Sequence, residues 1–409
     1  MAIQTSQRGR RMPASPIRKL MPLADAARKR GVRVYHLNIG QPDLETPAAM
    51  RRKLADAPAI FAYSPSPGTP ECRSALSEYY RRSGIEVAAE EIVVTTGGSE
   101  AILFAMMACA DAGDEVLLAE PFYTNYASFA EMAGLRLIPL RTRGEDGFHL
   151  PPPVEWKRAL TPRSRLVLLN NPNNPTGTVY RPDEIEALLA FCLEHELFLV
   201  GDEVYREFVY DGRRTTSVLN LAGGEQAVVL VDSLSKRYSA CGIRLGCLAT
   251  RNREVFDAAL RMAQGRLSPP GLAQLVALGA SELPADYAAG ILREYQARRD
   301  LLFEGLARIP GVFLRKPEGA FYLVARLPLE DAEDFARWLL TEWSLEGGTV
   351  MVAPAEGFYV TPGLGRDEVR IAYVLNQEDL ERSIRILEQA IPAYQRSHGR
   401  AAAGAHVRA

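Results

Sequence analysis

A lysine, Lys236, follows a run of β-forming residues and lies three residues after a serine, Ser233, in a Ser-Leu-Ser-Lys sequence. A lone lysine of this kind is in most proteins a solvated surface residue. Here, however, Arg244 follows eight residues later. It lies between Gly242 and Gly246, whose lack of a side chain lets the backbone turn and approach closely. An arginine that folds back in this way can bind an anion, so the spacing indicates an amine beside an anion site.

Two further segments place polar groups at the ends of predicted strands. Gly98 and Ser99 belong to a Gly-Gly-Ser turn that follows a strand-like run, residues 91–95, and opens an apolar helix. Backbone N–H groups at a helix N-terminus can bind phosphate, although many such turns bind nothing. Asp202 follows an apolar strand predicted over residues 198–200. A carboxylate there faces the crevice in which α/β proteins bind ligands, unless it only caps the next helix.

Other polar and aromatic residues have ordinary explanations when each is taken alone. Asn174 lies in an Asn- and Pro-rich segment, residues 170–177, that is compatible with a plain turn. Arg370, in a Val-Arg-Ile-Ala run, lies either on a solvated strand face or in a cleft with an anionic partner. Tyr63 is in a Pro-containing loop, and Tyr123 follows a proline closely. These residues indicate a site only in combination with the lysine segment.

The elements that must position these residues alternate between short β-rich runs and helical patterns. Residues 182–194, for example, open with Pro-Asp-Glu, as a helix N-terminus does. Continuous apolar strands that alternate with helices predict an α/β fold with a mostly parallel central sheet, covered by helices on both faces. The strand-like runs span residues 91–95, 115–119, 136–140, 166–169, 198–200, 228–231 and 245–250.

After residue 283 the pattern changes to one long charged helix, residues 287–306, followed by shorter strand candidates. This change predicts a second, smaller α+β domain. The expected organisation is a disordered tail over residues 1–12, an N-terminal segment over 13–45 that packs on the small domain, a large domain over 46–285, a small domain over 286–395 and a disordered tail over 396–409.

Bulk composition excludes several classes of function. The chain has 409 residues and a formal net charge of -2, which favours neither nucleic acid nor an anionic membrane as a partner. Its five cysteines lack CxxC spacing, which argues against a metal site and a disulfide framework and favours a cytoplasmic protein. No apolar run reaches the roughly 18 residues that span a bilayer. The arginines of the first 11 residues precede no apolar region, so they indicate a basic tail rather than a secretory signal.

The segment Ser-Leu-Ser-Lys-Arg-Tyr-Ser-Ala-Cys-Gly-Ile-Arg-Leu-Gly, residues 233–246, resembles the signature of class I aminotransferases of pyridoxal-phosphate (PLP) fold type I. Further motifs follow in the family's order over residues 16–392, and the resemblance is to the prokaryotic aspartate/aromatic branch. It implies that Lys236 holds PLP as a Schiff base and then moves the α-proton of the substrate. Ser233 and Arg244 are implied to bind the cofactor phosphate.

The same resemblance assigns groups to the PLP ring. Asp202 would pair with the protonated pyridine nitrogen, which keeps the ring able to accept electrons. Asn174, in Asn-Pro-Thr-Gly, and Tyr205, in Asp-Glu-Val-Tyr, would donate hydrogen bonds to the phenolic oxygen, and Asn174 would also contact the substrate. Tyr123 would stack on the ring. Lys236, Asp202 and Tyr205 are therefore the expected catalytic residues.

Further residues are implied to bind the phosphate, one of them from a second subunit. Gly98 and Ser99 correspond to the family's phosphate-binding turn. Tyr63, in Phe-Ala-Tyr-Ser-Pro, matches a family tyrosine that reaches the phosphate of the neighbouring subunit's cofactor. The resemblance therefore implies a homodimer with an active site at the subunit interface.

Two residues are implied to bind the substrate's α-carboxylate. Arg370 would hold it with both arms of the guanidinium group, and Gly40, in Asn-Ile-Gly-Gln-Pro-Asp, would add a backbone contact. Aspartate-specific relatives often have a lysine at the position of Ser99, and its absence weakens an assignment to aspartate. Arg18 and Arg237 are the candidates to replace it, and an apolar or aromatic amino donor is equally compatible.

The implied reaction is a ping-pong transfer of an amino group from an L-amino acid to a 2-oxo acid, with 2-oxoglutarate as one acceptor. Two alternatives stay open: a PLP lyase that performs β-elimination or decarboxylation, and a PLP-binding regulatory domain without catalysis. The joint presence of the implied lysine, aspartate, asparagine and two arginines argues against the second alternative.

Overall fold

Seven strands form the central sheet of the large domain in the computed structural model, which describes residues 3–284 and 286–398. Their order is β2-β8-β7-β6-β5-β3-β4. The strands β7, β6, β5, β3 and β4 pair in parallel, whereas β8 runs antiparallel to both of its neighbours. The predicted mostly parallel sheet is confirmed. The strands are β2 (Ile92–Thr95), β3 (Glu115–Glu120), β4 (Arg136–Arg141), β5 (Ser164–Asn170), β6 (Phe198–Asp202), β7 (Val228–Ser233) and β8 (Gly246–Ala249).

Helices cover both faces of this sheet, which explains why its inner strands are apolar at successive positions. One face is covered by α5 (Gly98–Cys109), α6 (Asn125–Ala133) and α9 (Arg253–Gly265). The other is covered by α4 (Pro70–Arg82), α7 (Pro153–Ala159), α8 (Pro182–Glu194) and α10 (Gly271–Leu278). Every residue of β2, β3 and β7 is buried as a result.

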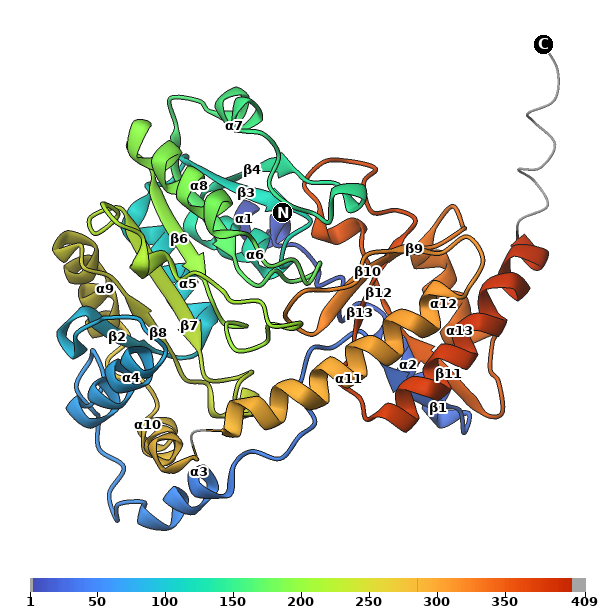
Figure 1. Ribbon diagram of the computed structural model, residues 1–409, viewed down its shortest axis with the longest axis horizontal. Helices are drawn as coiled ribbons and strands as arrows, with labels where there is room; N and C mark the ends of the chain where they lie inside the picture. Colours follow the sequence, from blue (N-terminus) through green and yellow to red (C-terminus); the bar gives the residue numbers. More distant parts are fainter. Residues whose placement is uncertain (1–2, 285, 399–409) are drawn as a thin grey trace.

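A separate core holds the smaller domain together. Its antiparallel sheet has the order β12-β13-β10-β9, and a parallel pair, β1-β11, lies beside it. The long helix α11 (Tyr287–Ala307) runs from the large domain into the small one (Figure 1). The strands are β1 (Arg33–His36), β9 (Phe313–Leu314), β10 (Tyr322–Arg326), β11 (Gly348–Met351), β12 (Ala353–Pro354) and β13 (Glu368–Ala372), and the other helices are α2 (Met21–Lys29), α12 (Ala332–Thr341) and α13 (Gln377–His398).

The N-terminal segment belongs to the small-domain core although it is far away in sequence. Strand β1 pairs with β11 in parallel register, and Leu20, Ala24 and Leu37 are buried in the same core. Before this segment, Gln7–Arg11 form a short helix, α1, within the tail that the sequence analysis expected to be disordered. The Ser6 side chain accepts a hydrogen bond from the first turn of α1, and Arg11 forms an ion pair with Glu131.

At the other end, α13 continues to His398, so it includes the start of the second predicted tail, and residues 399–409 lie outside the described residues. The chain returns to the large domain through α3 (Ala48–Arg52), which contacts the short helical turn Gly279–Glu282 just before α11. The chain therefore passes between the two domains twice, once before and once after the residues that form the large domain.

No helix in the described part of the chain is long and apolar enough to cross a membrane. The same residues contain no group of three or more His, Cys, Asp or Glu side chains that could hold a metal ion. All five cysteines are free, and Cys241 is the one that is not fully buried.

Candidate active site

A cavity of about 550 Å³ lies where the large domain meets the small one. Its floor is built from the last residues of three parallel strands, Asn170, Asp202 and Ser233, because the carboxyl ends of parallel strands meet at one edge of a sheet. The N-terminus of α5 closes one side. The small domain contributes Tyr322 from β10 and Arg370 from β13.

This cavity brings together almost all of the residues that the sequence analysis nominated. They are Gly40, Gly98, Ser99, Tyr123, Asn174, Asp202, Tyr205, Ser233, Lys236, Arg244 and Arg370. Among the residues that the family resemblance assigned to the cofactor or the α-carboxylate, Tyr63 is the exception, because it is 80% exposed and does not line the cavity. Its position on the surface is compatible with a contact to another subunit, but not with a contact to this cavity in its own chain.

Lys236 extends into the cavity from the loop after β7. Its Nζ donates a hydrogen bond of 2.8 Å to the backbone carbonyl of Gly40 and lies 3.7 Å from the sulfur of Cys241. Burial lowers the pKa of the Lys236 amine, and the positive charges of Arg370 and Arg244 act in the same direction. A lowered pKa makes the neutral amine, which is the nucleophilic and basic form, more accessible.

Asp202 lies at the end of β6 and is 5% exposed. Its Oδ2 accepts a hydrogen bond of 2.5 Å from the Tyr126 hydroxyl, and its Oδ1 accepts one of 3.3 Å from the backbone N–H of Val204. Burial raises the pKa of Asp202 to about 6, although both hydrogen bonds act in the opposite direction. Because burial disfavours the ionised form of this carboxylate, a cationic group placed next to it would stabilise that form.

Two tyrosines join the domains at the back of the cavity. The hydroxyls of Tyr205, just after β6, and Tyr322, on β10, lie 2.9 Å apart. Gly40 is close to the same point, because a Cβ at this position would lie 1.7 Å from the Tyr322 hydroxyl oxygen. Any side chain at residue 40 would therefore displace Tyr322 and close part of the cavity.

The loop that carries Arg244 approaches the N-terminus of α5 very closely. Gly97 caps this helix at φ +76°, and a Cβ on it would lie 2.5 Å from Nη2 of Arg244. A Cβ on Gly246 would likewise lie 2.7 Å from the backbone nitrogen of Gly98. The two glycines thus allow a guanidinium group to lie beside backbone N–H groups at a helix N-terminus, which is a favourable arrangement for a phosphate.

Arg370 is a buried cation in this cavity without an anionic partner among the described residues. It is 1% exposed, and its hydrogen bonds go to Oδ1 of Asn174, at 3.1 Å, and to the backbone carbonyl of Asn38. Its guanidinium stacks on the rings of Tyr322 and Phe358, at 4.5 and 5.1 Å from their centroids. Its Nε has no hydrogen-bond partner among the described residues. A buried cation that meets only neutral groups indicates a site for an anionic ligand.

Sequence reasoning missed some residues and proposed one that lies elsewhere. Tyr126 follows Tyr123 by three residues, but nothing in its local pattern connects it to Asp202. Tyr322 comes from a strand without any motif. Arg237, considered as a binder of the substrate's distal carboxylate, does not line this cavity and pairs with Asp232 instead. That suggestion is therefore wrong.

Residues 32–387 match the family described as aminotransferase class I and II. The chain is 35% identical over 380 residues to the aspartate/prephenate aminotransferase of Thermus thermophilus, covering 89% of this chain and 93% of the relative. A Thermus thermophilus aspartate aminotransferase solved with maleate has a TM-score of 0.85 at 31% identity, covering 95% of this chain and all of that one. An alanine aminotransferase from Pyrococcus furiosus reaches a TM-score of 0.87 at 28% identity, with 95% of this chain and 100% of that chain covered.

Proposed function

The chain belongs to the class I and II aminotransferases, PLP-dependent enzymes that transfer amino groups between amino acids and oxo acids, and we propose that the cavity around Lys236, Asp202 and Arg370 is its active site. The observation that carries the proposal is that one cavity contains a buried acid and a buried base, each without an oppositely charged partner among the described residues. A buried carboxylate, Asp202, meets no cation there, and a buried guanidinium, Arg370, meets no carboxylate among the described residues. A cofactor with a cationic ring nitrogen and a substrate with a carboxylate would satisfy both.

The side chains of the cavity fit PLP group by group. Asp202 would pair with the ring nitrogen, Asn174 and Tyr205 would donate to the phenolic oxygen, and Tyr123 would cover a ring face. The phosphate would lie between Arg244 and the N-terminus of α5, where Ser233, Gly98 and Ser99 also line the cavity. When bound, PLP supplies an electron sink for the negative charge that develops at the substrate's α-carbon.

The protein's own contribution is to orient the substrate and to move one proton. Arg370, with Asn174 and the backbone of Gly40, holds the α-carboxylate, which directs the α-hydrogen towards Lys236. The Lys236 amine would then take the proton from the substrate's α-carbon and hold it for the later return step. Its lowered pKa favours the neutral form that this step requires. The small domain carries Arg370 and Tyr322 and so supplies the wall of the cavity to which the α-carboxylate would bind.

The same residues serve both halves of a ping-pong reaction, since the second substrate is also an α-carboxylate compound. An L-amino acid would leave as a 2-oxo acid before the acceptor, such as 2-oxoglutarate, enters. A panel of amino donors mixed with the PLP-loaded enzyme tests this proposal, with the 2-oxo acid and free ammonia measured separately. Production of 2-oxo acid without ammonia supports transfer. Ammonia or carbon dioxide release as the main reaction would favour a PLP lyase instead.

We propose dicarboxylic amino acids as one class of donor. The relative with 35% identity is named for aspartate and prephenate, and a related structure was solved with maleate, a dicarboxylate. In this chain Arg18 is exposed and lines the same cavity, which also has the apolar side chains of Ile39 and Ile102 in its lining. A guanidinium at the cavity mouth would attract a distal carboxylate, and the isoleucines would tolerate an apolar or aromatic side chain.

We also propose that a second copy of the chain completes the site. Ile60, Phe61 and Tyr63 are 79, 69 and 80% exposed, and Leu267 is 53% exposed. The two segments are adjacent, because Ser64 lies within hydrogen-bond distance, 3.4 Å, of the Pro269 carbonyl. Large exposed apolar side chains on two neighbouring segments are typical of a subunit interface. A homodimer would bury these side chains and bring Tyr63 to the partner's phosphate site. Sedimentation equilibrium tests this, and a monomer would contradict it.

A cytoplasmic location is also part of the proposal. All five cysteines are free, which suits a reducing compartment. Cell fractionation with an antibody to the chain is the direct measurement.

A further inference from the structure

The loop that carries Lys236 is a wall common to two cavities. Residues 233, 235 and 236 line the active-site cavity, whereas residues 234, 237 and 238 line a second cavity of about 320 Å³ in the large domain. Lys236 and Arg237, although adjacent in sequence, therefore face different cavities. The amine of Lys236 reaches the active site, and the Arg237 side chain, which is 3% exposed, is held inside the large domain.

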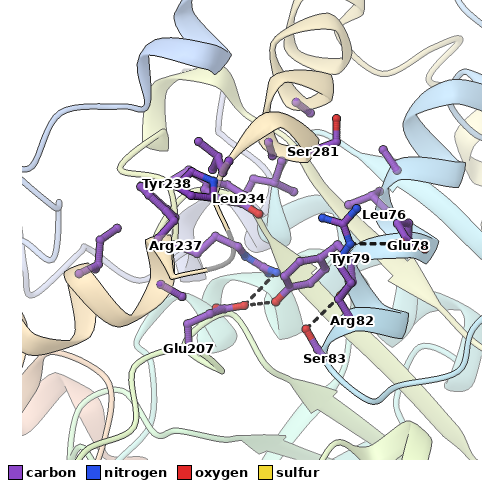
Figure 2. Close-up of a pocket in the computed structure, with 18 of the residues that line it drawn as sticks. Leu76, Glu78, Tyr79, Arg82, Ser83, Glu207, Leu234, Arg237, Tyr238 and Ser281 are labelled. Carbon is purple, nitrogen blue, oxygen red and sulfur yellow. Dashed lines mark hydrogen bonds and ion pairs between the residues drawn. The ribbon is translucent and has the colours of Figure 1, made fainter.

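The guanidinium group of Arg237 lies between two carboxylates. Its Nη2 pairs with Oδ2 of Asp232, and its Nη1 lies 3.2 Å from Oε1 of Glu207. The ring of Tyr79 packs against the same group, with its centroid 4.2 Å from Cζ of Arg237. Figure 2 shows Arg237, Glu207 and Tyr79 converging at one side of the second cavity. Because a guanidinium is planar and its N–H groups have fixed directions, these contacts restrict Arg237 to one orientation.

This guanidinium group also connects the two ends of the segment that contains Lys236. Asp232 lies in β7, just before Ser233, and Arg237 comes directly after Lys236. Nη2 of Arg237 donates a further hydrogen bond, of 3.3 Å, to the backbone carbonyl of Ser233. Oδ1 of Asp232 accepts one of 2.7 Å from the backbone N–H of Ser233. The ion pair therefore closes a loop over residues 232–237, and Lys236 lies inside that loop.

Asp232 provides a fixed end for this loop. It is buried, and its Oδ2 accepts a hydrogen bond of 2.9 Å from the Tyr80 hydroxyl on α4. A second cation, Arg206, lies 3.7 Å from the same oxygen. Strand β7 pairs with a strand on each side, and all of its residues are buried. An arginine that pairs with Asp232 is therefore tied to a rigid part of the sheet.

The residues around Lys236 have less support from their own backbone. Residues 234–239 belong to neither a helix nor a strand, so no regular pattern of backbone hydrogen bonds holds them. Consecutive Cα atoms are about 3.8 Å apart, so an anchor on residue 237 directly restricts residue 236. This restriction matters for chemistry, because a displacement of about 1 Å can lower a rate by about 100-fold.

We propose that Arg237 is a positioning residue for Lys236: its pairing with Asp232 fixes the backbone of the lysine and so directs the amine into the active-site cavity. The inference rests on the proposed role of Lys236 in amino transfer. Arg237 does not line the active-site cavity, so it affects the steps that Lys236 performs and not the binding of the substrate's carboxylate. A lysine at this position would keep the charge but not the fork that contacts Asp232, Glu207 and the Ser233 carbonyl together.

Arg237→Lys in the full-length, PLP-loaded enzyme is the main test, because it leaves a cation beside the buried Asp232. We expect kcat per PLP-loaded site to fall about tenfold, with less than about a twofold change in KM for the amino donor, and Arg237→Gln to lower kcat by about 100-fold. If Arg237→Gln does not fold, Arg237→Lys alone decides. Borohydride reduction and mass spectrometry count the loaded sites.

Arg299→Lys is the matched control. Arg299 is also buried and paired with an aspartate, Asp211, but it lines neither cavity. Its substitution should lower the midpoint of unfolding and leave kcat unchanged. A purely structural role of Arg237 would give the same result, whereas a positioning role lowers kcat in the folded, PLP-loaded enzyme.

Hydrogen exchange followed by mass spectrometry adds a readout that does not depend on turnover. The amides of residues 233–240 should exchange faster in Arg237→Lys than in the unmodified enzyme or in Arg299→Lys, with and without PLP. Unchanged exchange in this segment, an unchanged kcat, or an equal fall of kcat in Arg299→Lys would overturn the inference alone. Absence of PLP from Lys236 in the unmodified enzyme would overturn the proposed function, and this inference with it.

Discussion

The Tyr126 hydroxyl donates a hydrogen bond of 2.5 Å to Oδ2 of Asp202, and both side chains are buried. Burial is the largest influence on Asp202 and raises its pKa to about 6, while the bond from Tyr126 opposes this effect. Tyr126 does not line the active-site cavity. We therefore propose that Tyr126 acts through Asp202, because its hydrogen bond orients the carboxylate and favours the ionised form.

Tyr126→Phe is expected to lower kcat by roughly tenfold with little change in the KM for the amino donor, because the lost bond involves a charged group. The pKa of Asp202 should rise, so the acidic limb of the kcat profile should move to higher pH. The control is Tyr295→Phe, since the Tyr295 hydroxyl is buried without a hydrogen-bond partner among the described residues. An unaltered pH profile in Tyr126→Phe would show that Tyr126 only fills space.

Lys236→Ala should abolish covalent attachment of PLP and lower turnover by a factor of roughly 10³ or more, because both the attachment point and the general base are removed. Borohydride reduction followed by mass spectrometry of the intact chain measures the attachment directly. Lys316→Ala removes a lysine that pairs with Asp300 and should leave the mass increase intact. A reduced adduct that persists in Lys236→Ala would assign the cofactor to another lysine.

Arg370→Lys keeps a positive charge but loses the forked geometry that suits a carboxylate. We expect KM for every α-amino acid to rise by a factor of roughly 10 to 100, because a hydrogen bond to a charged group is lost in a buried site. Steady-state kinetics with several donors provides the measurement. Arg366→Lys, at an exposed arginine that pairs with Asp331, is the matched control. Equal effects of the two substitutions would remove Arg370 from the substrate site.

The buried carboxyl of Asp202 should make the cofactor-free protein less stable as pH rises. Below the unfolded pKa, near pH ~4, both states carry the proton. Between there and the folded pKa of about 6, the folded state retains a proton that the unfolded chain releases, so stability falls by up to about 3 kcal/mol. Denaturant unfolding from pH 4 to 7 should show a smaller decrease in Asp202→Asn. An identical pH dependence in the two proteins would contradict the raised pKa.

Arg18→Gln should affect donors selectively. KM for aspartate and glutamate is expected to rise about fivefold, as for the loss of a partly exposed ion pair, whereas KM for phenylalanine should not change. Lys19→Gln alters the neighbouring cation, which pairs with Glu333, and should leave both classes unaffected. A uniform change in KM for all donors would show that Arg18 does not distinguish side chains.

Local sequence patterns predicted the large-domain sheet because its strands are buried on both faces. β5, β6 and β7 appear as continuous apolar runs, and each ends in a polar residue that reaches the cavity. The motif around Lys236 and Arg244 is compact in the chain, so the spacing could predict that both side chains line one cavity. Nothing local revealed that β8 is antiparallel to its neighbours, since an apolar strand has the same pattern in either direction.

The helix α1 was missed for a related reason. Its residues are polar and exposed, and no apolar periodicity marks a short helix of this kind. It is stabilised by a cap from Ser6 and by contacts with α6, and the second of these depends on chain folding. Tyr322 had no signal either, because its partner Tyr205 lies 117 residues away.

By itself, the sequence determined the family, the cofactor and most of the residues that converge on the cavity around Lys236, because chemical groups at strand ends and within one short loop can be identified from neighbours in the chain. Only the tertiary structure decided which groups face each other. Three findings depend on contacts between distant segments. Tyr126 donates a hydrogen bond to Asp202, and Arg370 has no carboxylate partner among the described residues. Lys236 and Arg237 line different cavities. Such contacts follow from how helices and domains pack, which local patterns do not encode.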